Sequence, residues 1–193
     1  MDAIEALATR RSTSVFSETE PPREVVTRLI EAATWAPNHR HTEPWRFAVL
    51  AGQAREKMGD RVAEWMRAEF DQEIAEKQAE STKRKLVRSP LIIVVSQARS
   101  AGDTVKDLED YAACCSATQN LLLAAHAEGL ASKWSTGTLA VAPPVFEYLG
   151  LPDQDRVVAF VYLGYPADDA EPRQPQRARA VIDWHGFEGL GGR

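Results

Sequence analysis

Apolar and polar residues alternate along the chain in blocks that favour an α+β protein. Short apolar runs of strand length occupy residues 45–50, 91–96 and 157–164. The run at 91–96, LIIVVS, predicts a central strand with both faces covered, and the run at 45–50 predicts another buried strand. A shorter strand is expected at 130–137, where it leads into a Ser/Thr/Gly turn.

Between these runs the spacing of apolar residues changes to three and four, which predicts helices. The expected helices are 2–9, a second one opened by Pro21-Pro22, 104–128 and 142–149. The helix at 104–128 is apolar nearly all round, which is typical of a core or interface helix.

Residues 53–88 form a separate, highly charged helical segment. One interpretation is a solvent-facing helix or pair of helices. The other is a cover over a functional site, with Trp65, Met66 and Phe70 pointing inward.

The loop at 35–47, WAPNHRHTEPWRF, combines aromatic, proline and hydrogen-bonding residues. Pro37 and Pro44 restrict their own φ and bias the preceding residues to extended shapes. Such a stiffened loop can hold a flat polar ligand by its edge. The alternative is a loop plugged into the core by Trp35 and Trp45.

Composition narrows the class of protein. With 193 residues, 44% of them hydrophobic and 26% charged, the chain is expected to form a single globular domain over 1–193. A net charge of −5 argues against nucleic acid as the main partner. The longest apolar run, 121–125, is too short to span a membrane, and the N-terminus lacks the apolar region of a signal peptide. We therefore expect a cytoplasmic protein.

No common motif of hydrolytic, metal-dependent or nucleotide-triphosphate chemistry is present. The sequence lacks zinc-type Cys/His spacing, a Walker A loop and a GxSxG elbow, so it predicts no metal ligand and no catalytic side chain. Cys114 and Cys115 lie mid-helix in an apolar segment, a poor setting for a reactive thiolate.

The remaining candidates are ligands for a cofactor. Arg10 and Arg11 precede three hydroxyl residues, which predicts either a phosphate clamp or a solvated basic turn. Gly137 permits close backbone approach to a ligand, or forms a plain tight turn. Phosphate ligands and aromatic loops without a catalytic side chain indicate that a bound cofactor carries the chemistry.

Four elements, in this order, resemble the nitroreductase family of FMN-dependent oxidoreductases. They are Arg10-Arg11-Ser12, the loop APNHRHTEPWRF, the stretch SATQNLLLAAHAEGLASKWSTG, and the VYLGYP strand end with an arginine-bearing tail. The resemblance covers nearly the whole chain. Pro37-Asn38-His39 is similar to the AP-x-H loop of a short bacterial subgroup.

The resemblance implies an α+β, nitroreductase-like fold with a central mixed β-sheet flanked by helices. It also implies a homodimer of domain-swapped type with FMN at the interface. The tail at 166–193 would wrap around the partner subunit.

The resemblance also assigns cofactor-binding residues. Arg10, Arg11 and Ser12 would hold the phosphate and ribityl end, and Trp35 and His39 would contact the flavin from the other subunit. His41 and Glu43 stand where the family commonly has Asn and Gln, and His41 is expected at the flavin edge. Further ligands are expected at Trp134, Ser135, Thr136 and Gly137 beside the isoalloxazine, at Ala124, Ala125, His126, Ala127, Glu128 and Gly129 near the nicotinamide of NAD(P)H, and at Arg177 and Arg179 at the phosphate.

The implied activity is a ping-pong, two-electron reduction of nitroaromatics, quinones or similar small-molecule acceptors, with NAD(P)H as co-substrate. Two alternatives stay open. A same-fold flavoenzyme could act on a specific metabolite, as a dehydrogenase or dehalogenase. A non-catalytic flavin-binding module could use the charged segment at 53–85 as a contact surface.

Overall fold

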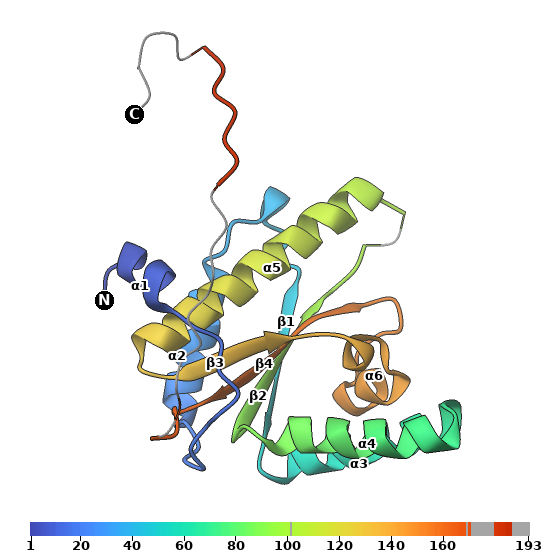
Figure 1. The fold of residues 1–193 in the computed structure, drawn as a ribbon. Coiled ribbons are helices and arrows are strands. Elements are labelled where there is room, and N and C mark those ends of the chain that lie inside the picture. Colours follow the sequence, from blue (N-terminus) through green and yellow to red (C-terminus); the bar gives the residue numbers. More distant parts are fainter. Residues whose placement is uncertain (101, 169, 171–179, 187–193) are drawn as a thin grey trace.

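The computed structural model describes residues 1–100, 102–168, 170 and 180–186, without the side chains of residues 72–74. In the described part, helices cover both faces of one four-stranded sheet (Figure 1). The strands are β1 (Trp45–Ala51), β2 (Leu91–Gln97), β3 (Ala131–Ser135) and β4 (Arg156–Gly164). Their spatial order is β1-β2-β4-β3.

Strand position in the sheet explains the burial of each strand. The central strand β2 is buried at every position, as its apolar run predicted. β1 is an edge strand, so the prediction of a buried strand there was wrong for most of its residues. Only Trp45 and Leu50 are buried, whereas Arg46 and Val49 are exposed.

All three strand pairs are antiparallel. The parallel component of the predicted mixed sheet is limited, among the described residues, to an isolated bridge between Ser12 and Ser132. That bridge extends the sheet at its β3 edge and brings the N-terminal segment beside this strand.

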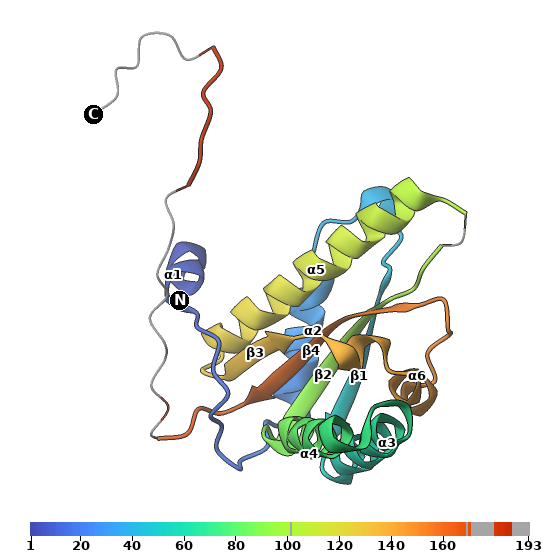
Figure 2. The same ribbon diagram turned by 45° about the vertical axis from the view of Figure 1, so that its right-hand side comes forward.

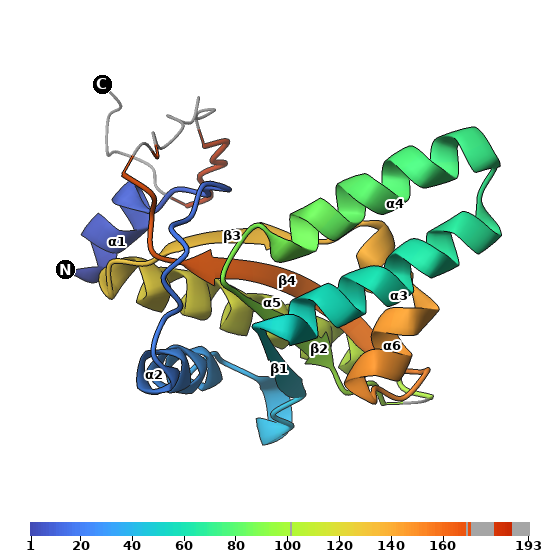
Figure 3. The same cartoon turned by 90° about the horizontal axis from the view of Figure 1, so that it is seen from below.

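One layer of the molecule consists of α2 (Arg23–Thr34) and α5 (Thr104–Ala127). The other contains the hairpin of α3 (Gln53–Glu69) and α4 (Gln72–Val87), with α6 (Pro143–Leu149) beside it (Figure 3). The helices predicted at 104–128, 142–149 and within 53–88 are therefore confirmed to within one or two residues.

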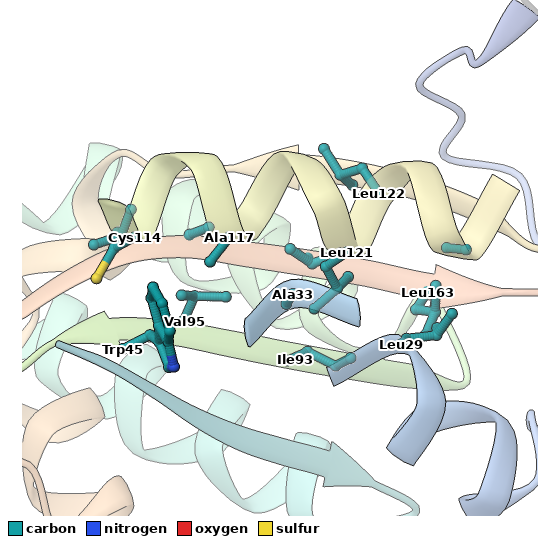
Figure 4. Packing of buried hydrophobic residues seen from close by; sticks show 14 of the residues in the cluster. Leu29, Ala33, Trp45, Ile93, Val95, Cys114, Ala117, Leu121, Leu122 and Leu163 are labelled. Carbon is teal, nitrogen blue, oxygen red and sulfur yellow. The ribbon is translucent and has the colours of Figure 1, made fainter. Parts of the chain in front are cut away.

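Two hydrophobic clusters join these layers to the sheet. On the first face, Leu29 and Ala33 of α2 meet Leu121 of α5 over Ile93 of β2 (Figure 4). Small residues such as Ala117 let α5 approach the sheet closely. On the second face, Met58 and Met66 pack with Phe160, which is fully buried.

The short helix α1 (Ala3–Thr9) is capped by Asp2, whose carboxylate accepts a hydrogen bond from the Glu5 amide at 2.8 Å. Residues 180–186 stand away from the sheet (Figure 2), and Val181 is 94% exposed. The predicted wrapping of a partner by 166–193 stays a prediction, because much of this tail, including Arg177 and Arg179, lies outside the described residues.

Candidate functional site

The predicted phosphate clamp lies along the free edge of β3. The Thr13 amide donates to the Ser132 carbonyl at 3.2 Å, and Lys133 Nζ donates to Ser14 Oγ at 3.1 Å. These contacts place Arg10, Arg11 and Ser12 beside the start of the strand. Lys133 is a further cation at this edge. It lies beside the clamp because β3 pairs with the N-terminal segment.

The two arginines carry positive charge that no described carboxylate offsets by an ion pair. Burial and the neighbouring charge of Arg11 lower the pKa of Arg10. Arg11 Nη1 donates to the carbonyls of Ala8 and Arg10, each at 2.8 Å. This fixes the guanidinium without neutralising it, and clustered unpaired cations favour an anion.

Two buried polar atoms at the clamp have no hydrogen-bond partner among the described residues. They are Arg11 Nε and Ser132 Oγ. Unsatisfied buried polar groups are costly and rare in native proteins, so such atoms indicate a missing ligand or water. Both groups can donate a hydrogen bond, which is the chemistry that a phosphate oxygen accepts.

His126 at the end of α5 faces the same region. Its Nε2 lies 2.8 Å from Thr9 Oγ1, and that hydroxyl already donates its only hydrogen to the Glu5 carbonyl. The imidazole must therefore carry its hydrogen on Nε2. Burial, followed by the charges of Arg10 and Arg11, lowers the pKa of His126, so the ring is neutral at pH 7.

His126 and Gly129 line a small cavity of about 280 Å³ together with Arg11. The segment 124–129 thus lies at the clamp end of β3. Its expected position near a nicotinamide stays a prediction, and the geometry favours a role at the phosphate end.

A larger cavity of about 810 Å³ opens at the other end of β3. A strand rises about 3.3 Å per residue, so Ser135 lies about 10 Å beyond Ser132 along this edge. The cavity is bounded by the turn between β3 and the 3-10 helix η2 (Thr138–Val141), by α4 and by the sheet. Its lining residues are Met66, Lys77, Gln78, Ser81, Thr82, Lys85, Ser135, Thr136, Gly137, Thr138, Leu139 and Tyr162.

Three of the four residues predicted around the ring, Ser135, Thr136 and Gly137, line this cavity. Gly137 has φ of 89°, a conformation that favours glycine. Trp134 does not line it, because alternate residues of a strand face opposite sides. Its indole packs on the α2–α5 side and donates to the Val158 carbonyl at 3.2 Å.

Tyr162 is a polar cavity residue that the sequence analysis missed. It belongs to β4, where its hydrophobic neighbours conceal it within an apolar run. Burial raises the pKa of its hydroxyl above the ordinary value of 10.0, so the group stays protonated and able to donate a hydrogen bond.

The loop before β1 holds three non-glycine residues in the left-handed region. They are Arg40, His41 and Glu43, with φ of 58°, 50° and 44°. Such conformations each cost about 1–3 kcal/mol and concentrate at functional sites. Asn38 Oδ1 accepts from the Glu43 amide at 3.0 Å, and Thr42 Oγ1 donates to Asp110 of α5 at 2.6 Å. These contacts hold the loop in its shape.

The two tryptophans of this loop differ in their exposure to solvent. Trp45 is buried in the core, but Trp35 is 86% exposed. The interpretation of a loop plugged into the core by both residues is therefore wrong for Trp35. His39 and His41 are exposed as well, so the loop presents a ring and two imidazoles to its surroundings.

The comparisons with known proteins agree with this architecture. Residues 7–165 match the sequence pattern of the Nitroreductase family. The Escherichia coli K12 protein named "Putative NAD(P)H nitroreductase YdjA" is 32% identical over 166 residues, covering 86% of this chain and 89% of the relative. The chain belongs to the nitroreductase family.

Solved structures of nitroreductases share the fold. A nitroreductase-like family protein from Bacillus cereus superimposes with a TM-score of 0.83 at 29% identity, covering 95% of this chain and 97% of the other. A nitroreductase with bound FMN from Bacteroides fragilis gives 0.78 at 24% identity, over 95% and 98% of the two chains. The predicted nitroreductase-like α+β fold is confirmed, and membership of the family makes the chain an oxidoreductase.

The described residues form neither a membrane-spanning helix nor a metal-binding cluster. No helix there is long and apolar enough to cross a membrane. No group of three or more His, Cys, Asp or Glu residues is arranged for a metal ion in the same part of the chain. Burial raises the pKa of the Cys114 thiol to about 12, which makes that cysteine unreactive at neutral pH.

Proposed function

We propose that the protein is an FMN-dependent reductase that uses NAD(P)H to reduce nitroaromatics, quinones or similar flat acceptors. The observation that carries the proposal is the pair of uncompensated arginines with buried, unpaired Arg11 Nε and Ser132 Oγ. This clamp lies at one end of β3, and an open cavity lies at the other. The relatives' names supply the same cofactor and co-substrate.

The residues present fit FMN. Arg10, Arg11 and Ser12 would bind the phosphate, and Lys133 follows along the strand toward the ring end. Ser135 and Gly137 would meet the isoalloxazine, with the protonated Tyr162 hydroxyl as a donor in the same cavity. When bound, FMN would supply two-electron redox chemistry between a pyridine nucleotide and the acceptor. The chain itself binds, orients and donates hydrogen bonds.

The site is completed, in this proposal, by a second copy of the chain. Trp35 is 86% exposed and stands on a strained loop, so its ring is available to contact the flavin of a partner. The outer face of α5 is also apolar at its exposed residues Val105 and Leu108. We assign His39 and His41 to the same intersubunit contact. We also propose that the protein is located in the cytoplasm.

Steady-state kinetics test this function. FMN-loaded protein is assayed with NADH or NADPH against a nitroaromatic and a quinone, each substrate being varied at several levels of the other. A ping-pong mechanism should give parallel lines in double-reciprocal plots of rate against substrate concentration. Failure to oxidise either pyridine nucleotide in the presence of both acceptors would contradict the proposal.

A second candidate is a same-fold flavoenzyme for one specific metabolite. His41 and Glu43 in place of the common Asn and Gln favour it, together with their strained conformations. Rapid reduction by NAD(P)H but slow turnover of every nitro and quinone acceptor would favour this candidate.

A further inference from the structure

Two lysines of α4 lie among the described residues that line the large cavity. Lys77, Ser81 and Lys85 follow one another at intervals of four residues, so they share one face of the helix. Both lysines line the cavity. No carboxylate is among its described lining residues, and most of the other polar lining residues carry a hydroxyl group.

Two acidic residues of α4, Glu76 and Glu80, face α3. Glu76 and Glu80 pair with Arg67 of α3, at 2.7 Å and 2.9 Å. Lys83 turns the same way and pairs with Asp60 of α3. Packing of the hairpin thus separates the charges of α4: the paired groups face α3, and the lysines without an ion-pair partner among the described side chains face the cavity.

A third cation adds to this field. Arg88, at the end of α4, favours the ionised form of Tyr162, although burial has the larger effect on that hydroxyl. Its charge therefore acts on a residue of the cavity wall. The cavity has positive charge on one wall and hydrogen-bond donors on the others, while Met66 and Leu139 supply apolar surface.

We propose that Lys77 and Lys85 select acceptors that carry a carboxylate or another anionic group beside their flat ring. The inference rests on the proposed function, since it places the acceptor in the cavity next to Ser135 and Gly137. Each exposed ion pair contributes little to the free energy of binding. The two lysines therefore act mainly on the choice between charged and neutral acceptors. The pyrophosphate of NAD(P)H offers similar chemistry, and the experiment separates the two sources.

The test compares 4-nitrobenzoate with 4-nitrobenzamide, which have similar shapes but differ by one charge. Dissociation constants are measured calorimetrically with the oxidised, FMN-loaded protein, and kcat/KM is measured with NADH. Wild type should prefer the carboxylate in both measurements. Lys77→Gln and Lys85→Gln should each reduce the preference by about 1.4- to fivefold, the range of an exposed ion pair. The double variant should abolish it.

Lys83→Gln is the matched control, because Lys83 lies on the same helix but pairs with α3. It should leave the preference unchanged, and melting curves should show all variants folded. Equal binding of the two acceptors by wild type, or an unchanged preference in the double variant, would overturn the inference.

Anaerobic reduction of the bound FMN by NADH tests the alternative that the lysines bind the pyrophosphate. If the lysines bind the pyrophosphate instead, their loss slows this half-reaction and weakens NADH binding, while the ratio between the two acceptors stays constant. That result would overturn the assignment to the acceptor. Failure of the proposed function looks different, because wild type would then turn over neither acceptor with either pyridine nucleotide.

Discussion

At the scale of single residues, the clamp combines charge with unsatisfied donors. Arg10 and Arg11 repel each other. Burial, followed by the charge of Arg11, lowers the pKa of Arg10, and burial, followed by the charges of Arg10 and Arg11, lowers the pKa of His126. A bound dianion would remove this repulsion. Binding of an anion should therefore lower the electrostatic energy of the clamp. Two predictions follow from this expectation.

The first prediction concerns Arg11. The substitution Arg11→Gln removes a charge-assisted hydrogen-bond donor. Such a donor contributes about 1.5–3 kcal/mol to the free energy of anion binding. The dissociation constant of FMN should rise by about tenfold or more, measured by flavin fluorescence. Arg23→Gln, an exposed arginine on α2, is the control and should bind FMN as wild type does. Equal affinities in all three proteins would remove Arg11 from the site.

The second prediction concerns the protonation of His126. Its pKa lies below the ordinary value of 6.5 because of burial and the nearby arginines. Inorganic phosphate at the clamp should raise this pKa, since the anion offsets the charge of Arg10 and Arg11. Titration of the imidazole protons by NMR, with and without phosphate, measures the shift. A pKa unaffected by saturating phosphate would show that the anion binds elsewhere.

At the scale of elements, an ionic cluster joins α5 to β2 and β4. Asp107 accepts bidentate hydrogen bonds from Arg99, at 2.9 Å and 3.0 Å, and another from Arg156 at 3.2 Å. Buried Gln97 Nε2 also donates to Asp107 Oδ1 at 3.0 Å. Arg99, followed by Arg156, lowers the pKa of Asp107 below its ordinary value of 3.8.

Asp107→Asn should therefore reduce the free energy of unfolding by about 1–3 kcal/mol at pH 7, because the arginines lose their shared carboxylate. A lowered folded-state pKa stabilises the protein above the unfolded value of 3.8, and this contribution disappears as pH falls through the folded pKa. The difference between variant and wild type should thus narrow below pH 3.8, as measured by urea unfolding. Glu76→Gln, which removes an exposed pair, should cause little change.

The elements themselves could be predicted because their signals are local. The apolar run of β2 and the small-residue stripe of α5 give their length and burial directly. The edge position of β1 could not be predicted, because it depends on strand order. The parts of Tyr162 and Lys85 in the cavity were missed for a similar reason: both residues line it only because β4 and α4 pack around the turn after β3. The spacing of Lys77, Ser81 and Lys85 was the available signal.

At the scale of the whole molecule, the described chain leaves part of its proposed site uncovered. Trp35 is 86% exposed, and truncating so exposed a side chain changes the stability of one subunit by only about 0.5 kcal/mol or less. Trp35→Ala should nevertheless weaken FMN binding if the indole contacts the flavin of a partner. Sedimentation and flavin fluorescence measure dimerisation and affinity. Val141→Ala, at another exposed apolar residue, is the control. Unchanged FMN affinity in Trp35→Ala would contradict the intersubunit contact.

In the proposed function, this member of the nitroreductase family transfers electrons from NAD(P)H through FMN. The most direct measurement is the absorption spectrum of the FMN-reconstituted protein under anaerobic conditions, before and after addition of NADH or NADPH. The protein-bound flavin spectrum should bleach within the time of an assay and return when a nitroaromatic or quinone is added. A protein that takes up no FMN, or whose bound flavin neither nucleotide reduces, would contradict electron transfer through FMN.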